Sequence, residues 1–298
     1  MAKVLITGIG GFTGRYLARQ LAASGHDVCG LAHRAGPSWE WPTHVVDLLD
    51  RRRLSEIVEL ERPDMVAHLA AIAFVAHDDI SSIYQTNVVG TRNLLAALSS
   101  SSHQPDAVLI ASSANIYGNA DCEVIDESVP PAPANDYAVS KLSMEYAARL
   151  WSEQLPIVFV RPFNYTGVGQ AENFLLPKIV SCFRSHTPVL ELGNLDVIRD
   201  FSDVRAVVAI YERLLTGAFA GETFNVCSGT GYSLQEVLSI MEKLAGYRPE
   251  VRVNPNFVRA NEVRKLVGDD SKLRRAIGEA PRPIPLGDTL KWMLESVD

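Results

Sequence analysis

The chain has 298 residues, of which 47% are hydrophobic and 21% charged, and a net charge of −7. That length allows one large domain or two modest ones with a sizeable core, and the composition is ordinary for a globular protein. An acidic balance without long basic runs lacks the electrostatic footprint of nucleic-acid binding. The longest apolar stretch, residues 69–76, is too short to cross a bilayer, so we expect no membrane partner either.

The N-terminal sequence MAKVLITG enters a strand-like apolar run with none of the features of a secretory leader, so we expect a cytoplasmic protein. The cysteines are Cys29, Cys122, Cys182 and Cys227. They form none of the close pairs that metal sites or redox motifs use. We interpret all of them as buried thiols and expect no metal site.

Short apolar runs alternate with amphipathic segments through the first half of the chain. The former predict strands and the latter predict helices. The predicted strands are residues 3–8, 27–34, 44–48, 64–70, 107–113 and 156–162, and the predicted helices are 16–23, 52–61, 82–98 and 137–154. Buried strands separated by helices are typical of a parallel sheet with right-handed crossovers, which predicts a doubly wound α/β fold.

The pattern changes after residue 162. Turn signals surround a helical run at 177–185, and a capping box of Ser233 and Glu236 opens a helix that should end at Gly246. We therefore predict a smaller C-terminal lobe, made of residues 164–199 and 223–298. Residues 1–163 and about 200–222 should form the larger domain, to which the run 204–215 returns as a helix.

A glycine-rich turn joins the first predicted strand to the first helix, with Gly8, Gly10, Gly11 and Gly14 between them. In such a turn, the first glycine allows a tight bend and the middle ones let backbone amides approach a pyrophosphate. The last lets helix and strand pack closely. The turn therefore predicts a dinucleotide site.

The end of the second strand bears on which dinucleotide binds. A carboxylate there usually binds an unmodified ribose, whereas a basic residue accommodates a 2′-phosphate. This chain has His33 and Arg34 at that point and no carboxylate, which favours NADP(H) over NAD(H). Asp47, at the end of the third strand, is a candidate adenine contact.

A serine, a tyrosine and a lysine form a candidate catalytic set. Tyr137 and Lys141 are four residues apart on a predicted helix and so share one face. An ammonium near a phenol lowers the phenol's pKa and makes it a usable proton donor and acceptor. Ser112 and Ser113 end the fifth strand, at the sheet edge where open α/β folds bind ligands. A serine there can hold a carbonyl that Tyr137 protonates while a nicotinamide delivers hydride.

Over essentially its whole length the chain resembles the extended short-chain dehydrogenases/reductases that modify nucleotide sugars, which have a Rossmann fold. The matching motifs lie at residues 7–14, 68–71, 86–91, 112–118, 137–141 and 161–170. The resemblance implies Ser113, Tyr137 and Lys141 as the catalytic set, with Asn87 supporting a helix bend and Lys141 also holding the nicotinamide ribose. The implied cofactor contacts are Gly8, Gly11, Phe12, Thr13, Gly14, His33, Arg34, Asp47, Leu48, Leu69, Ala70, Ala71, Tyr137 and Lys141.

The second lobe is similar to that of GDP-mannose 4,6-dehydratases and, more closely, of GDP-4-keto-6-deoxy-D-mannose reductases. The resemblance implies a GDP-sugar substrate whose contacts are Ser113, Asn164, Lys178, Arg199, Arg259 and Glu262. Cations suit a diphosphate, and a carboxylate suits ribose hydroxyls.

One position argues against dehydration. Dehydratases of this kind carry a glutamate two residues before the tyrosine of the strand-end motif, and here Asn115 stands two residues before Tyr117. An amide cannot act as that acid or base. The sequence therefore predicts NADPH-dependent reduction of the C4 ketone of GDP-4-keto-6-deoxy-D-mannose. The product is either GDP-D-rhamnose or GDP-6-deoxy-D-talose, because segments expected to line the sugar depart from the family pattern at Ile72 and Tyr165.

Three alternatives stay open: a nucleotide-sugar 4-epimerase, a reductase acting on another NDP-4-keto-6-deoxy sugar, and a non-catalytic NADP(H)-sensing protein. An epimerase would keep its nicotinamide bound, whereas a reductase must exchange it. A sensing protein would not need the Tyr137 and Lys141 pair. The resemblance also implies a homodimer that pairs the helices predicted at 82–98 and 137–154.

Overall fold

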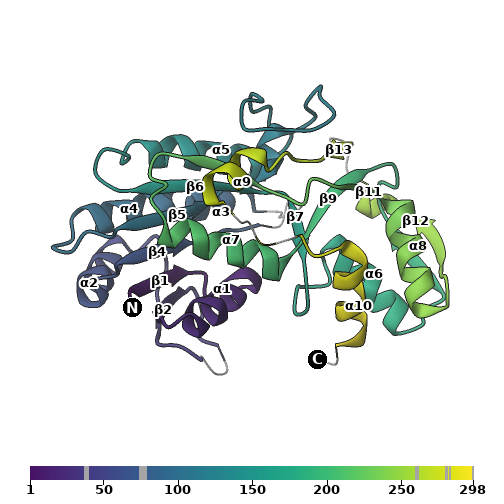
Figure 1. Cartoon of the computed structure of the whole chain (residues 1–298), viewed down its shortest axis with the longest axis horizontal. Coiled ribbons are helices and arrows are strands. Elements are labelled where there is room, and N and C mark those ends of the chain that lie inside the picture. Colours follow the sequence, from purple (N-terminus) through teal and green to yellow (C-terminus); the bar gives the residue numbers. More distant parts are fainter. Residues whose placement is uncertain (37–39, 74–78, 259–261, 279–280, 282, 297–298) are drawn as a thin grey trace.

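A parallel sheet forms the centre of the larger domain (Figure 1). The computed structural model describes residues 1–36, 40–73, 79–258, 262–278, 281 and 283–296. Within them, seven strands lie in the order β10-β6-β5-β4-β1-β2-β3. They are β1 (Lys3–Thr7), β2 (Asp27–Ala32), β3 (Thr43–Val45), β4 (Met65–His68), β5 (Ala107–Ala111), β6 (Ile157–Pro162) and β10 (Thr223–Val226). From β1 the chain adds β2 and β3 on one side and then β4, β5, β6 and β10 on the other. In open α/β sheets, ligands bind at the carboxyl ends of the strands where the direction of strand addition changes in this way.

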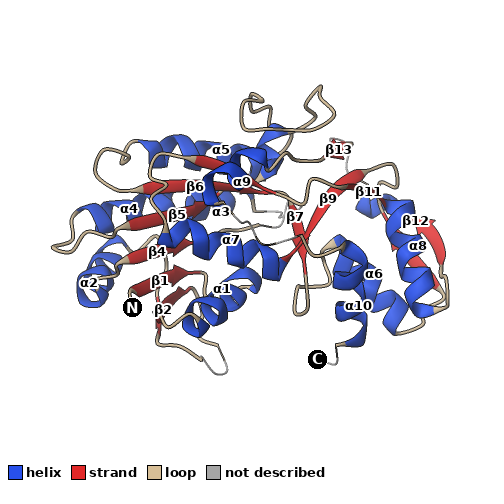
Figure 2. Cartoon of the chain, viewed as in Figure 1, coloured by secondary structure: helices blue, strands red, loops and turns tan. Residues whose placement is uncertain are grey.

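Helices cover both faces of this sheet (Figure 2), as the doubly wound prediction requires. One face carries α1 (Phe12–Ala23) and α7 (Val204–Thr216), and the other carries α2 (Arg51–Glu61), α4 (Thr91–Ser99) and α5 (Asp136–Arg149). Alternate residues of β1 enter the two cores, since Val4 and Ile6 pack toward α1 and Leu5 packs toward α2. Burial on both faces explains why these strands are apolar throughout.

The helix predicted at 82–98 consists of three joined segments. α3 (Ile80–Tyr84) leads into a π-helical segment, η1 (Gln85–Gly90), and then into α4. A π-helical segment widens the helix locally and often lies at a functional site. This is the position of the bend that the resemblance implied at Asn87.

A smaller lobe contains two further sheets and its own core. Its strands are β7 (Asn164–Thr166), β8 (Val189–Leu192), β9 (Ile198–Asp203), β11 (Gly231–Ser233), β12 (Glu250–Val253) and β13 (Lys265–Leu266). Its helices are α6 (Leu175–Arg184), α8 (Leu234–Ala245) and α10 (Leu286–Glu295). The capping box of Ser233 and Glu236 is present, and Gly246 ends α8 in the left-handed conformation, as predicted.

Three sequence expectations need correction. Residues 223–226 were assigned to the lobe, but as β10 they pair with β6 and cover what would be an open edge of the large sheet. Residues 200–203 were assigned to the larger domain, but they belong to β9, which pairs with β7, β11 and β13. Cys122 is exposed, not buried, whereas the other three cysteines are buried as expected.

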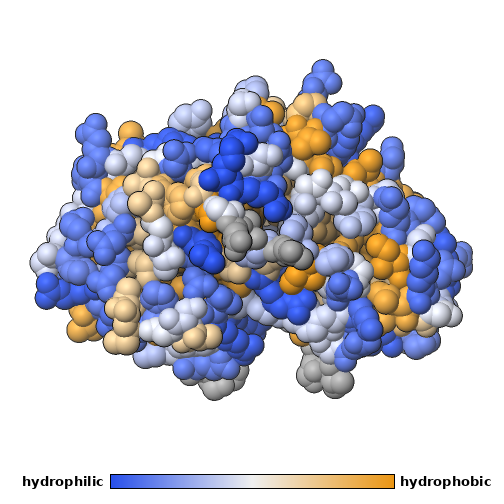
Figure 3. Space-filling model, in the orientation of Figure 1, coloured by the Kyte–Doolittle hydropathy of each residue, from blue (hydrophilic) through white to orange (hydrophobic). Residues whose placement is uncertain are grey.

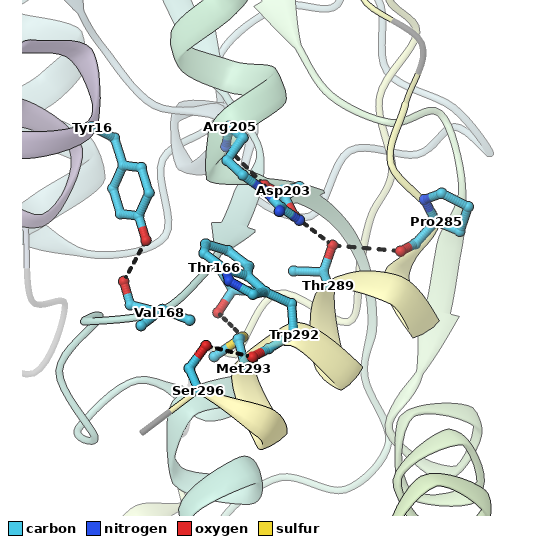
Figure 4. A network of polar contacts seen from close by, with 10 residues as sticks. All are labelled: Tyr16, Thr166, Val168, Asp203, Arg205, Pro285, Thr289, Trp292, Met293 and Ser296. Atoms are coloured by element: carbon cyan, nitrogen blue, oxygen red, sulfur yellow. Dashed lines mark hydrogen bonds and ion pairs between the residues drawn. The ribbon is translucent and has the colours of Figure 1, made fainter. Parts of the chain in front are cut away.

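Side chains at the end of β9 and on α10 join the lobe to the larger domain (Figure 4). The Asp203 carboxylate accepts a hydrogen bond of 2.8 Å from Thr289 of α10. It also forms an ion pair of 2.7 Å with Arg205 of α7. The Arg205 guanidinium in turn lies 3.8 Å from the ring centre of Trp292. α10 therefore fixes the lobe against the start of α7.

One face of the molecule shows how polar and apolar residues are distributed over the surface. The face in Figure 3 is mostly hydrophilic with scattered hydrophobic residues, and it is notched at its lower edge between the larger domain and the lobe. Among the helices of the described residues, none has the length and apolarity to span a bilayer.

Candidate active site

Two elements bring the predicted catalytic residues together at the carboxyl edge of the large sheet. Ser113 lies just beyond β5 and caps the short helix η2 (Ala114–Tyr117), while Tyr137 and Lys141 lie on the first turns of α5. All three side chains are buried, with 4%, 7% and 4% of their surface exposed. The Lys141 ammonium donates a hydrogen bond of 2.6 Å to the Ala111 carbonyl at the end of β5. That bond fixes α5 against the strand that delivers the serine.

Asn115 orients the serine. Its backbone amide and its side-chain amide donate to Ser113 Oγ over 3.2 and 3.1 Å. Because the serine oxygen already accepts these two bonds, its own proton is available for a ligand oxygen or for the phenol beside it. Sequence reasoning used Asn115 only to exclude dehydration and did not predict this positioning role.

The expected effect of Lys141 on Tyr137 is not the one observed. Burial raises the pKa of Tyr137 to about 12, the hydrogen bond with Ser113 opposes that rise, and Tyr165 adds to it. The sequence had predicted that the lysine lowers this pKa, but its ammonium points to the Ala111 carbonyl. At neutral pH the phenol therefore holds its proton and is suited to donate it.

Lys141 itself titrates closer to neutrality than an ordinary lysine. Burial lowers its pKa to about 8, and the carboxylate of Glu145, one helical turn further along α5, opposes this shift. Glu145 is in turn held by Arg161 at the end of β6, through Nε–Oε1 and Nη2–Oε2 distances of 2.9 and 2.7 Å. The buried ion pair of Glu145 and Arg161 was not predicted. The sequence does show that Glu145 lies one turn after Lys141 on the same helix face, which could have indicated a buried charge there.

The glycine turn has the shape that a dinucleotide needs. Gly8 has a φ of +71°, and a Cβ there would lie 2.9 Å from the Ala70 amide nitrogen. A Cβ on Gly14 would lie 2.3 Å from the Gly8 carbonyl, so helix and strand approach at this point as predicted. Gly11 caps α1 without any side-chain hydrogen bond, which leaves the first amides of the helix available to a pyrophosphate. These residues fit a nicotinamide dinucleotide.

The other expected cofactor contacts lie at the same edge. Leu69, Ala70 and Ala71 directly follow β4, and Leu48 is buried. His33 and Asp47 follow β2 and β3, with Nδ1 and Oδ2 3.9 Å apart, and Arg34 is exposed beside them. This end of the site therefore presents a carboxylate as well as the two basic residues.

A buried histidine links the cofactor turn to the catalytic helix. The Ala70 amide donates to Thr7 Oγ1, which lies 2.7 Å from His68 Nδ1. On the other side His68 Nε2 lies 2.8 Å from Thr91 Oγ1, whose proton goes to the Asn87 carbonyl. Burial lowers the pKa of His68 to about 3, so the imidazole is neutral and carries one proton. Because the Thr91 proton goes to the Asn87 carbonyl, His68 donates to Thr91 at Nε2 and accepts from Thr7 at Nδ1.

Asn87 continues this connection to Tyr137. Its side-chain oxygen accepts from the Ile72 amide over 2.9 Å, and its side-chain nitrogen donates to Ser140 Oγ over 3.0 Å. Ser140 then donates to the Tyr137 carbonyl over 2.7 Å. The π-helical segment thus supports the catalytic helix beside the site, in the way the resemblance implied.

We expect His68 to make folding sensitive to acid. Its pKa is depressed in the folded chain, so the unfolded chain takes up a proton as the pH falls below about 6.5 and folding weakens. At pH 5 this should remove about 2 kcal/mol relative to pH 7. Chemical denaturation at both pH values should show this loss in the natural protein and in a His186→Asn control, an exposed histidine, but not in His68→Asn or His68→Gln. An unchanged loss in both His68 variants would contradict the assignment.

Apart from Ser113, the expected substrate contacts that the structure describes lie in three places. Arg199 on β9 and Glu262 are brought together, with Nη2 and Oε1 2.6 Å apart. Asn164 begins β7, and its buried Nδ2 has no hydrogen-bond partner among the described residues. Lys178 on α6 lies with its ammonium 3.8 Å from the ring centre of Phe257. Arg259, the remaining expected contact, lies outside the described residues.

Tyr165 was singled out in the sequence only because it departs from the family pattern. In the structure, Tyr165 hydroxyl lies 2.7 Å from Thr13 Oγ1, and its ring stacks on Phe12. Both partners belong to the first turn of α1. Neither segment by itself indicates this contact, because the two residues are 152 positions apart in the sequence.

The model of one protein family, described as GDP-mannose 4,6 dehydratase, matches residues 5–283. The chain belongs to this family of extended short-chain dehydrogenases/reductases. Its members act on nucleotide sugars as oxidoreductases and epimerases, and this chain is such an enzyme with the Rossmann fold that was predicted. Among the described residues, no group of His, Cys, Asp and Glu could hold a metal ion.

Two curated relatives are each 34% identical to the chain. GDP-6-deoxy-D-talose 4-dehydrogenase of Aggregatibacter actinomycetemcomitans aligns over 93% of this chain and 91% of its own length. GDP-6-deoxy-D-mannose reductase of Pseudomonas aeruginosa aligns over 98% and 96%. The names of these relatives contain GDP-6-deoxy-D-talose and GDP-6-deoxy-D-mannose, which is GDP-D-rhamnose. These are the two C4 epimers between which the sequence did not decide.

Solved structures agree on the fold. RMD from Pseudomonas aeruginosa complexed with NADPH has a TM-score of 0.83 at 31% identity, covering 99% of this chain and 98% of its own. A Burkholderia cenocepacia J2315 protein, described provisionally as an epimerase, has a TM-score of 0.92 at 53% identity, covering 99% and 97%. MoeE5 in complex with UDP-glucose and NAD has a TM-score of 0.89 at 26% identity, covering 98% and 97%. Two of these structures thus hold a nicotinamide cofactor, which is NADPH in RMD and NAD in MoeE5.

Proposed function

We propose that the protein reduces the C4 ketone of GDP-4-keto-6-deoxy-D-mannose with NADPH, giving GDP-D-rhamnose or GDP-6-deoxy-D-talose. The observation that carries this proposal is the geometry around Ser113. Asn115 occupies the dehydratase glutamate position and holds the serine through two hydrogen bonds of 3.2 and 3.1 Å. The site thus has a complete set for carbonyl reduction and an amide where dehydration needs an acid and base.

The Tyr137 phenol is suited to donate a proton to the ketone. Burial raises its pKa to about 12, so it is protonated over the physiological range. A ketone reductase needs such a proton donor beside the carbonyl oxygen.

Each residue has a distinct task in this reaction. When bound, the reduced nicotinamide supplies the hydride. Ser113 donates a hydrogen bond to the ketone oxygen, and Tyr137 donates a proton to the same oxygen as negative charge develops there. Lys141, anchored on the Ala111 carbonyl, is placed to hold the nicotinamide ribose. His68, Thr91, Asn87 and Ser140 hold the catalytic helix in register with the cofactor turn.

A GDP-linked substrate is supported by the lobe and by the relatives. Arg199 has 8% of its surface exposed and is already oriented by Glu262, so its charge is positioned for a diphosphate. The two relatives at 34% identity both act on GDP-6-deoxy sugars, as their names state. NADPH is favoured by His33 and Arg34 at the end of β2 and by the NADPH bound to the Pseudomonas aeruginosa structure.

The decisive test is incubation of the protein with freshly prepared GDP-4-keto-6-deoxy-D-mannose and NADPH, followed by NMR of the product. We expect NADPH to be consumed and the C4 configuration to be read directly from the sugar coupling constants. Parallel reactions contain NADH, UDP- or dTDP-4-keto-6-deoxy sugars, or GDP-mannose alone. Preference for NADH or for a different nucleotide would refute that part of the proposal, and dehydration of GDP-mannose would refute the role assigned to Asn115.

A 4-epimerase is the second candidate, favoured by the 53% identity to the protein described provisionally as an epimerase. Such an enzyme would interconvert two nucleotide sugars without net use of NADPH. The purified protein would then carry a tightly bound nicotinamide that survives desalting. Release of the cofactor on desalting, together with stoichiometric oxidation of NADPH by the keto sugar, would exclude this activity.

We further propose a homodimer formed through α5. Tyr146 and Leu150, at the outer side of this helix, have 64% and 70% of their surfaces exposed. Light scattering should therefore give twice the chain mass of 32.6 kDa for the natural protein and the single mass for Tyr146→Glu/Leu150→Glu. Leu60→Glu, at an equally exposed leucine on α2, is the control and should stay dimeric. A natural protein that runs as a monomer would contradict the proposal.

A further inference from the structure

Tyr165 touches the cofactor side of the site from the lobe. Its hydroxyl lies 2.7 Å from Thr13 Oγ1. Its ring is nearly parallel to that of Phe12, with an angle of 14° and ring centres 6.1 Å apart. Both contacts cross from β7 in the lobe to the helix that follows the glycine turn.

The partners of Tyr165 stand where the pyrophosphate is expected. Phe12 and Thr13 are the first residues of α1, and their helix begins at Gly11 without a side-chain cap. Backbone amides at this point are the ones that meet a pyrophosphate. A residue that holds these two side chains also holds the conformation of those amides.

On its other side, Tyr165 adjoins the expected sugar site. It directly follows Asn164, whose buried Nδ2 has no hydrogen-bond partner among the described residues. A buried amide donor without a partner is costly, so a ligand oxygen at this point would stabilise β7. Tyr165 thus lies between the cofactor turn and Asn164.

We propose that Tyr165 is a positioning residue that couples the two ligands, so that a nucleotide sugar held at β7 strengthens NADPH binding at the start of α1. This inference rests on the proposed function, since it needs a nucleotide sugar at Asn164. The sugar immobilises β7, β7 holds Tyr165 against Phe12 and Thr13, and the first-turn amides are then ordered before the cofactor binds. By thermodynamic linkage, NADPH must strengthen sugar binding by the same factor.

Neighbouring contacts across the same boundary provide a matched control. Tyr16 donates to the Val168 carbonyl over 2.8 Å, as Figure 4 shows. This bond also joins α1 to the segment after β7, but it lies one helical turn beyond the amides that face the pyrophosphate. Its loss should weaken the contact between the two parts without disturbing the cofactor turn.

The experiment measures the dissociation constant of NADPH by its fluorescence, with and without saturating GDP-mannose. In the natural protein, GDP-mannose should tighten NADPH binding about fivefold or more. Tyr165→Phe and Thr13→Val should each remove most of that gain, and the double variant should be no worse than either single one. Thr13→Ser, which keeps the hydroxyl, and Tyr16→Phe should retain the gain.

Several outcomes would overturn the coupling. One is an undiminished gain in Tyr165→Phe and Thr13→Val, and another is additive losses in the double variant. A third is bound GDP-mannose, shown by calorimetry, that leaves NADPH affinity unchanged in the natural protein. UDP-glucose is tested in parallel: if it binds and GDP-mannose does not, the GDP-sugar proposal fails, and the coupling is then decided with UDP-glucose on the same variants. Binding of neither sugar contradicts both proposals.

Discussion

Replacing Tyr137 by phenylalanine should lower kcat for reduction of the keto sugar by about a thousandfold. The variant keeps the ring that fills this buried position, of which only 7% is exposed, and loses only the proton donor. Ser113 and Asn115 remain in place because their mutual hydrogen bonds do not involve the phenol. NADPH should therefore bind to the variant nearly as well as to the natural protein.

The measurement pairs steady-state kinetics on the keto sugar with a fluorescence titration of NADPH. Tyr146→Phe is the matched control, because Tyr146 lies on the same helix with 64% of its surface exposed and should keep full activity. Full activity in Tyr137→Phe would refute the proposed mechanism. Equal loss of activity and of NADPH binding would show that the hydroxyl acts on the cofactor and not on the ketone.

Replacing Arg161 by methionine should destabilise the fold by about 3–5 kcal/mol. The guanidinium is buried, with 7% of its surface exposed, and makes two bonds of 2.9 and 2.7 Å to Glu145. It also donates to the Tyr117 hydroxyl over 2.9 Å, and that hydroxyl donates to Asn225 of β10 over 2.8 Å. Without the arginine, the buried Glu145 carboxylate between α5 and the sheet keeps only the distant contact of 3.9 Å with the partly exposed Arg149.

Urea unfolding of three variants tests this account. Arg161→Met/Glu145→Met removes both charges and should recover much of the lost stability, since no unpaired ion remains. Arg149→Met is the control: Arg149 lies 3.9 Å from the same carboxylate but is 40% exposed, so its loss should cost under about 1 kcal/mol. A double variant as unstable as Arg161→Met would show that the arginine stabilises through packing and not through its pairing with Glu145.

The buried pair of Glu145 and Arg161 also helps to hold α5 beside the candidate active site. Tyr137, Lys141 and Glu145 follow one another at intervals of one turn along α5. In the proposed reaction the first donates the proton, while the second is anchored on the end of β5 and the third is fixed to the end of β6. The helix is thus tied to two neighbouring strands at the edge where Ser113 emerges, and the reacting phenol cannot move relative to the serine without breaking buried bonds.

Local sequence predicted the elements that carry the site, but it overestimated the strands. Five of the six predicted strands ran past the observed carboxyl end by one to three residues, as at 107–113 against β5 (Ala107–Ala111), and the sixth ends at residue 162 as β6 does. Some of the extra residues, such as Ser112 and Ser113, are buried although they no longer pair with a neighbouring strand, whereas His33, Arg34 and Asp47 are exposed polar residues. Periodicity reports burial, and at the carboxyl edge burial continues after hydrogen-bonded pairing ends.

The domain boundary could not be placed from pattern alone for a related reason. β9 and β10 are both short, mostly buried strands, and nothing in either shows which sheet it joins. β10 joins the large sheet because β6 offers an open edge, and β9 joins the small one because β7, β11 and β13 surround it. Pairing partners are chosen by the assembled neighbours of a strand, whereas its composition records only that it is buried.

The sequence by itself determined the doubly wound domain, the glycine turn and the set of Ser113, Tyr137 and Lys141, because spacing along a chain dictates which residues share a strand end or a helix face. Only the tertiary structure decided what surrounds them. It places the Lys141 ammonium on the Ala111 carbonyl, gives Asn115 the task of orienting Ser113, makes His68 neutral and brings Tyr165 against Thr13. These features depend on burial and on contacts between residues far apart in the chain, and a protonation state or a hydrogen-bond partner is set by what lies nearby in space.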